Sequence, residues 1–152
     1  MYCNYYIEQE PQNCFVAVNE SDEPVGYILC CENYDNYERV FSEVYLPQAA
    51  AISAKRYVDA KMDMLTHSMF RESYKCHFHI DVDENYQNEG LGTALIRALK
   101  TRLRKRRIES LMLVCDRQNE RAVAFYKKNG FKPLIETKFG LAMGLDLNAE
   151  EL

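Results

Sequence analysis

The chain has 152 residues, of which 47% are hydrophobic and 28% charged, with a formal net charge of −4 at pH 7. This composition excludes an intrinsically disordered chain, and the length predicts one domain, residues 1–152, with a core of its own. The net negative charge gives no reason to expect nucleic acid or an anionic membrane as a partner.

The first 31 residues combine a Tyr-rich start with two β-type runs. We expect residues 1–13 to form a helix tail or a loop, because Pro11 disfavours a helix that continues through that point. The apolar runs Cys14–Val18 and Val25–Cys31 are separated by a segment of strong turn composition. They are predicted to pair as a hairpin.

Residues 34–74 show helical spacing. Apolar residues recur at helical intervals up to Tyr45, Pro47 interrupts, and a looser pattern without Gly or Pro follows from Ile52 to Met69. We predict two helices, the first of them short, in a helical insertion at about 34–74. The insertion either shapes a substrate pocket or is a surface addition.

A strand, a turn and a helix are predicted next. Tyr74–Val82 alternates, with Phe78, Ile80 and Val82 on one face and His77, His79 and Asp81 on the other. A helix follows to about Arg107, with an apolar stripe formed by Leu91, Ala94, Leu95, Ala98, Leu99 and Leu103. Its basic residues are interpreted as a solvated face that complements the helix dipole, with nucleic-acid binding as the less favoured alternative.

The remaining elements complete a mixed α/β layered domain. Leu111–Cys115 is a buried strand, and a helix capped by Asn119 runs to Lys128, with Gly130 as its C′ residue. Two strands, in residues 131–135 and 139–147, close the chain. The strand-helix-strand unit from Cys76 to Cys115 is predicted to be parallel and right-handed.

The six cysteines form no Cys-x-x-Cys pair, and most lie in apolar runs, so we expect them to be reduced and structural. No apolar run approaches the roughly 18 residues of a membrane span, and the first residues lack the features of a signal peptide. We therefore expect a cytoplasmic protein without a membrane partner.

The turn after Val82 contains Gly90 and Gly92 and precedes a helix, where unpaired backbone N–H groups suit a phosphorylated cofactor. The alternative is an ordinary strand-to-helix connection. Leu95 stands where a dinucleotide fingerprint needs Gly or Ala, and no Gly-Lys-Ser/Thr of a Walker phosphate loop follows.

Two motifs in this order resemble the GCN5-related N-acetyltransferase (GNAT) superfamily. Gln87-Asn-Glu-Gly90-Leu-Gly92 is similar to its pyrophosphate loop, and residues 119–131, Asn-Glu-Arg-Ala-Val-Ala-Phe-Tyr-Lys-Lys-Asn-Gly-Phe, resemble its downstream element. Residues 74–87 are also similar to bacterial acetyltransferases related to the acetyltransferase-like domain of O-GlcNAcase. The resemblance implies a mixed, mostly antiparallel sheet.

The resemblance implies acetyl-CoA as cosubstrate. It implies that the strand ending at Val82 bulges and splays from the strand at Leu111–Cys115, so that a backbone N–H near Val82 can donate to the thioester oxygen. The implied coenzyme-binding residues are Val82, Gln87, Asn88, Glu89, Gly90, Leu91, Gly92, Thr93, Asn119 and Tyr126.

The implied reaction is direct acetyl transfer to an amine of a small molecule or a peptide. Tyr126 would protonate the departing thiolate, and an amine with a pKa near 10 needs a proton acceptor. The candidates are Asp81, which we favour, His79 and His77; each could instead be a hydrogen-bonded structural group. A metal is not expected, because no further ligand cluster accompanies the His-x-His-x-Asp row.

The superfamily usually begins with a strand and one or two helices before the hairpin, but only 13 residues precede Cys14. Either the chain is a truncated or alternatively started form, or residues 1–13 or another subunit cover the sheet edge. We therefore predict self-association as a homodimer. The alternative function is a non-catalytic acyl-CoA-binding or interaction module.

Overall fold

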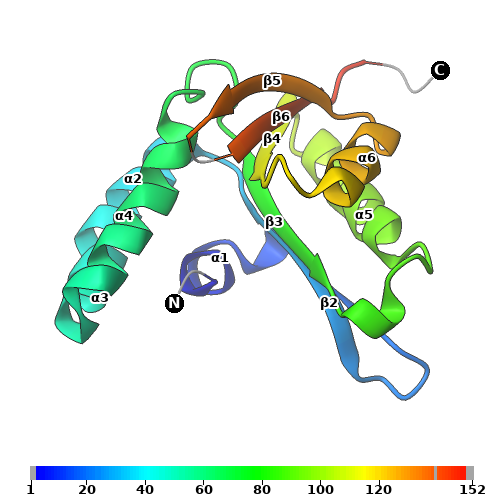
Figure 1. The fold of residues 1–152 in the computed structure, drawn as a ribbon, viewed down its shortest axis with the longest axis horizontal. Coiled ribbons are helices and arrows are strands. Elements are labelled where there is room, and N and C mark those ends of the chain that lie inside the picture. Colours follow the sequence, from blue (N-terminus) through cyan, green and yellow to red (C-terminus); the bar gives the residue numbers. More distant parts are fainter. Residues whose placement is uncertain (1–2, 139, 150–152) are drawn as a thin grey trace.

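The computed structural model describes residues 3–138 and 140–149 (Figure 1). In these residues, six strands form one sheet in the order β1-β2-β3-β4-β6-β5. The strands are β1 Cys14–Val18, β2 Pro24–Cys31, β3 His77–Val82, β4 Ser110–Cys115, β5 Lys132–Thr137 and β6 Gly140–Asp146.

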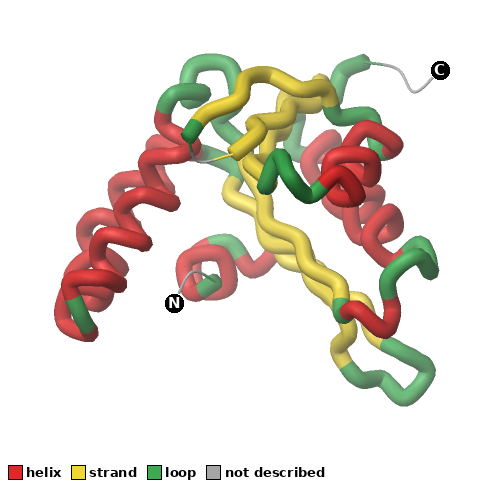
Figure 2. The backbone as a smooth tube through the Cα atoms, in the orientation of Figure 1, coloured by secondary structure: helices red, strands yellow, loops and turns green. Residues whose placement is uncertain are grey.

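Helices cover both faces of the sheet (Figures 1 and 2). One side carries α1 Asn4–Gln9, α2 Tyr34–Val40, α3 Leu46–Ile52 and α4 Ala54–Ser68. The other side carries α5 Leu91–Lys105 and α6 Glu120–Lys128. Short 3-10 turns lie at Pro11–Asn13 and Glu84–Tyr86.

The strand pairing confirms the predicted fold class. All paired strands are antiparallel except β3 and β4, which are parallel and share the single registered pair His77↔Met112. Beyond that pair the two strands separate, as Figure 1 shows. The sheet therefore consists of a β1-β2-β3 half and a β4-β6-β5 half that meet at one end.

Alternation along the strands gives the domain two cores. Ile28 and Cys30 of β2 face α5, with Phe78 of β3 and Leu99 of α5 in the same cluster. Leu29 and Cys31 face the opposite way into a cluster rich in tyrosines from α1, α2 and the π-helical turn after α2: Tyr5, Tyr6, Tyr34, Tyr37 and Tyr45. The N-terminal residues thus form a core helix, α1, whose Tyr5 and Tyr6 are fully buried.

The prediction of a first short helix that Pro47 ends is wrong. The chain stays helical from Tyr34 to Ile52, because a π-helical turn, Phe41–Tyr45, leads directly into α3. Pro47, which has no N–H to donate, follows this turn, where the ordinary i→i−4 bonds are already interrupted. The break comes at Ser53, whose hydroxyl accepts the Arg56 N–H at 3.2 Å and caps α4.

The predicted stripe of α5 is partly wrong. Ile96 is buried with Leu95, Leu99 and Leu103, whereas Ala94 is exposed. The basic residues of α5 are also less free than expected. Arg102 Nε donates to Asn13 Oδ1, Arg104 Nε donates to the Leu147 carbonyl, and Arg106, the C-cap residue, pairs with Glu32.

Strand β3 begins at His77, three residues later than predicted. Tyr74 instead packs against Gly144 of β6, where an added Cβ would lie 2.6 Å from the tyrosine Cζ. Across the described ranges, 3–138 and 140–149, no helix has the length and hydropathy needed to cross a bilayer.

Candidate functional site

The glycine turn joins β3 to α5 and exposes the start of that helix. Gly90 is the N-cap of α5 with φ +83°, a left-handed conformation, and an added Cβ there would meet nothing within 4 Å. The first intrahelical bond runs from the Ala94 N–H to the Gly90 carbonyl, so the amides of residues 91–93 precede the helical ladder. The turn therefore offers donors toward open space.

Gly92 has a different role from Gly90. A Cβ at Gly92 would lie 2.9 Å from Cζ of Phe125, so this glycine lets α6 approach α5. The missing side chain of Gly92 thus makes room for an aromatic ring, and a contact of its backbone with the coenzyme stays a prediction.

Polar side chains fix the turn to its neighbours. Gln87 Nε2 donates to the Val82 carbonyl at 2.9 Å, and Arg121 of α6 donates to Asn88 Oδ1 at 3.0 Å. Asn88 also has a left-handed φ of 68°. Glu89 is exposed, while Leu91, Gly92 and Thr93 are half-buried. The side chains of Gln87 and Asn88 thus hold the turn in shape, and its backbone groups are the ones left to face a ligand.

The opening between β3 and β4 lies beside this turn. The predicted splay is confirmed, since pairing ends at His77↔Met112 while β3 continues to Val82. The predicted bulge is wrong: β3 pairs with β2 without a register shift from His77 to Val82. The Val82 N–H donates to Oδ1 of Asp81 at 3.0 Å, and Asp81 is exposed.

Tyr126 of α6 lies on the α5 side of the opening. Its ring contacts Phe78, Phe125 and Phe131 edge-on, with centroids 6.4, 5.2 and 6.0 Å away. Burial, with Cys115 and Asp81 adding negative charge nearby, raises the pKa of Tyr126 to about 12. The phenol therefore keeps its proton at neutral pH.

Asn119 caps α6 as predicted. Its Oδ1 accepts the Ala122 N–H at 3.0 Å, and Gly130 follows the helix with φ +93°. The carboxamide oxygen is thus engaged within the chain.

Exposure rises along the polar row of β3. His77 is buried, His79 half-buried and Asp81 exposed. The Tyr6 hydroxyl lies 2.9 Å from His77 Nε2 and 3.0 Å from His79 Nε2, so α1 holds both imidazoles. The row therefore leads from the tyrosine-rich core to the opening.

Two α4 residues that the sequence analysis missed complete this cluster. The His67 ring stacks on His77 with centroids 4.2 Å apart, and Asp63 lies one helical turn earlier. Burial lowers the pKa of His67 to about 3, and burial lowers that of His79 against the opposing charge of Asp63. The Asp63–His67 spacing, i to i+4 on one helix face, was the available signal.

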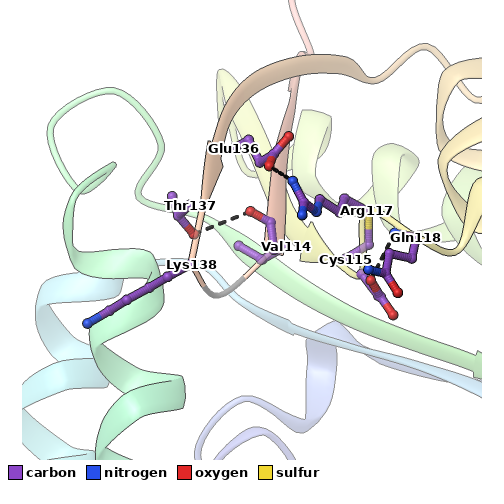
Figure 3. Close-up of a pocket in the computed structure, with 9 residues that line it drawn as sticks. Val114, Cys115, Arg117, Gln118, Glu136, Thr137 and Lys138 are labelled. Atoms are coloured by element: carbon purple, nitrogen blue, oxygen red, sulfur yellow. Dashed lines mark hydrogen bonds and ion pairs between the residues drawn. The ribbon is translucent and has the colours of Figure 1, made fainter.

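A pocket of about 510 Å³ lies at the end of β4, beside the β5–β6 turn (Figure 3). Cys115, Asp116 and Gln118 line it, and Arg117 pairs with Glu136 across it. Lys138 points away from that ion pair in Figure 3. In the part of the chain that the structure describes, no group of three or more His, Cys, Asp or Glu side chains is arranged to hold a metal ion.

The sequence matches the model of the acetyltransferase (GNAT) family over residues 1–131. It is 43% identical over 54 residues to the [ribosomal protein bS18]-alanine N-acetyltransferase of Escherichia coli K12, covering 36% of each chain. The chain spans about a third of the length of the curated relatives that it matches.

Solved structures share the fold. SsHAT superposes with a TM-score of 0.84 at 22% identity, covering 95% of this chain and 77% of that one. A Drosophila melanogaster polyamine N-acetyltransferase gives a TM-score of 0.68 at 14% identity, covering 94% of this chain and 79% of that one. At these identities the likeness concerns the fold.

Proposed function

The chain belongs to the acetyltransferase (GNAT) family, and from that premise we propose that it transfers the acetyl group of acetyl-CoA directly to an amine. The observation that carries the proposal is the open Gly90 turn at the start of α5, beside the separation of β3 from β4. Such a turn suits the pyrophosphate, and the separated strands leave unpaired backbone groups for the pantetheine arm.

In this proposal the coenzyme lies along residues 87–93. The first-turn amides of α5 donate to the pyrophosphate, and Gly90 keeps its approach clear. Gln87 and Asn88 act by holding the turn, because their side chains already bond to Val82 and Arg121. Asn119 can offer only its Nδ2 group, since Oδ1 caps α6.

The chemistry would take place at the exposed end of β3. The amine nitrogen attacks the thioester carbonyl carbon, the C–S bond breaks, and Tyr126 gives its proton to the thiolate. The Val82 N–H can stabilise the thioester oxygen once it leaves the Asp81 carboxylate, 3.0 Å away. Asp81 and His79 are the candidate acceptors for the amine proton.

The acceptor class follows from the family in outline only. Relatives include enzymes named for a ribosomal-protein alanine and for polyamines, so we propose a peptide or small-molecule amine.

We further propose a single domain over residues 1–152, a cytoplasmic protein, and no nucleic-acid or membrane partner. The narrower resemblance to the O-GlcNAcase-associated group stays a prediction.

A non-catalytic acyl-CoA-binding module is the second candidate, favoured by the Val82 N–H that already donates to Asp81. Thiol release from acetyl-CoA with a panel of polyamine, amino-sugar and peptide amines separates the two. Turnover on any amine supports the enzyme. Tight acetyl-CoA binding with no thiol release across the panel supports the module.

A further inference from the structure

Tyr6 of α1 places one hydroxyl between two imidazoles of β3. Its oxygen lies 2.9 Å from His77 Nε2 and 3.0 Å from His79 Nε2. Tyr6 and His77 are buried, so water does not compete freely for these bonds. The titratable groups facing the two histidines are Tyr6 from α1, Tyr34 and Tyr37 from α2, and Asp63 and His67 from α4.

The number of protons that these groups carry limits which hydrogen bonds they can form. A hydroxyl has one proton to donate, and a neutral imidazole carries its proton on one nitrogen only. If Tyr6 donates to His77, then His79 must carry its proton on Nε2 and donate to the Tyr6 oxygen. If Tyr6 donates to Tyr37, both histidines carry Nε2–H. Only donation to His79 would place the proton of His79 on Nδ1.

The stacked pair His67 and His77 selects among these arrangements. His67 Nδ1 lies 3.4 Å from the Asp63 carbonyl oxygen, which can only accept, so His67 carries Nδ1–H and a lone pair on Nε2. His67 Nε2 and His77 Nδ1 are both buried without a hydrogen-bond partner in the described residues. The two rings lie 4.2 Å apart.

Donation from Tyr6 to His77 puts the proton of His77 on Nδ1, so a buried N–H dipole lies beside a ring with a free lone pair. The other two arrangements place two unpaired lone pairs in the stack, and they repel in a medium of low dielectric constant. The electrostatics therefore favour the first arrangement, in which His79 is the Nε2–H tautomer.

We infer that Tyr6 is a positioning residue that fixes His79 as the Nε2–H tautomer and leaves its Nδ1 free to accept the proton of the acceptor amine. The role as proton acceptor rests on the proposed function, whereas the tautomer does not. When the ammonium N–H bond breaks, its proton passes to Nδ1 and the electron pair stays on the amine nitrogen.

The proton stays on His79 in this account. Passing it inward through Tyr6 would charge His77, which is fully buried beside His67, and burial holds the pKa of His77 well below its ordinary value. Burial also lowers the pKa of His79, but there the Asp63 carboxylate, an influence that His77 lacks, acts in the opposite direction and favours the imidazolium. The cluster therefore orients the base and does not conduct the proton into the core.

The tautomers can be read directly by NMR. The chain has three histidines, and two-bond ¹H–¹⁵N correlation spectra of ¹⁵N-histidine protein near pH 7.5, assigned with single His→Gln variants, give one pattern for each ring. We expect Nε2–H for His79 and Nδ1–H for His77 and His67. An Nδ1–H pattern for His79 would overturn the inference.

The Tyr6→Phe variant tests the positioning role. We expect its His79 pattern to become a tautomer mixture and turnover to fall at least about tenfold, with acetyl-CoA affinity unchanged. Tyr5→Phe is the matched control, because its buried hydroxyl bonds Glu10 and neither histidine. An unchanged His79 pattern and turnover in Tyr6→Phe contradict the inference. If that variant fails to fold, the wild-type spectrum decides.

The two proposals fail in different ways. An Nε2–H pattern at His79 without turnover on any amine counts against the proposed activity and leaves the tautomer assignment in place. Turnover in a protein whose His79 is Nδ1–H overturns the inference and leaves the activity in place.

Discussion

At the residue scale, both the left-handed backbone at position 90 and the proposed ligand require a residue without a side chain. In Gly90→Val, a β-branched side chain would stand in the open space that the pyrophosphate needs, and φ +83° would be strained. We expect acetyl-CoA affinity to fall at least about tenfold, measured by calorimetry, and stability to fall by roughly 1–2 kcal/mol.

Gly130→Val is the matched control for that strain. Gly130 also has a left-handed φ, +93°, but it follows α6, away from the turn. It should lose at least as much stability, because its Cβ would also lie 3.3 Å from Leu145 Cδ1, and it should keep acetyl-CoA affinity. Unaltered affinity in Gly90→Val would remove the turn from the binding site.

Tyr126 should matter for turnover more than for binding. In Tyr126→Phe we expect turnover to fall by up to about 10²-fold, the low end for a general acid, because a thiolate leaves fairly easily. With its pKa raised to about 12, Tyr126 should cause no alkaline loss of activity below about pH 11. Steady-state rates across pH, with Tyr74→Phe as control, check this.

The two glycines show where sequence reasoning reaches its limit. The need for glycine at position 90 could be predicted from the turn before a helix, because the signal is local. Gly92 could not be assigned, because its neighbour Phe125 comes from a helix far along the chain.

At the element scale, the contact between α5 and α6 depends on Gly92. Gly92→Ala brings a Cβ within 2.9 Å of Phe125 Cζ, so the ring must shift. We expect a loss of about 1 kcal/mol in urea unfolding. Phe125→Leu in the same chain should recover most of it, and additive losses would show that the two residues do not meet.

The elements that could be predicted are those with strong local patterns. The hairpin, the buried strand β4 and the caps of α6 carry short-range signals, Asn119 and Gly130 among them. The role of α1 could not be predicted, because Tyr6 contacts His77 and His79, which lie 71 and 73 positions later in the sequence. The helical run through Pro47 was missed, because a π turn has no clear sequence signal.

At the scale of the whole molecule, the buried histidines make stability depend on pH. Burial lowers the pKa of His67, His77 and His79 in the folded state, so below about pH 6.5 the unfolded chain binds protons more readily. Stability should fall on acidification by up to about 1.4 kcal/mol per pH unit for each histidine, continuing for His67 to about pH 3.

Urea unfolding at pH 7.5, 6.5 and 5.5 measures this slope. Asp63, whose pKa burial raises, opposes the trend at the acid end. In His67→Phe the free energy of unfolding should depend less steeply on pH, by up to the contribution of one histidine, about 1.4 kcal/mol per pH unit. A stability that stays flat from pH 7.5 to 5.5 would show that the histidines titrate normally.

The sheet edge at β1 leads to the prediction of self-association. Among the described residues β1 pairs with β2 alone, and its Val16 and Val18 are 60% and 47% exposed. We expect a homodimer by light scattering at micromolar concentration, and Val16→Lys should shift it to monomer. A wild-type monomer under these conditions would contradict the prediction.

The two halves of the sheet diverge from the single registered pair between β3 and β4, so His77 and Met112 mark the pivot of their separation. From that pivot β3 extends about 17 Å to Val82, at about 3.3 Å per residue. A rotation of roughly 5° at the pivot would move the Val82 end by about 1.5 Å over that length. Tyr6 and His67 contact His77 at that pivot, so a small change in their packing would produce its largest displacement at the Val82 end.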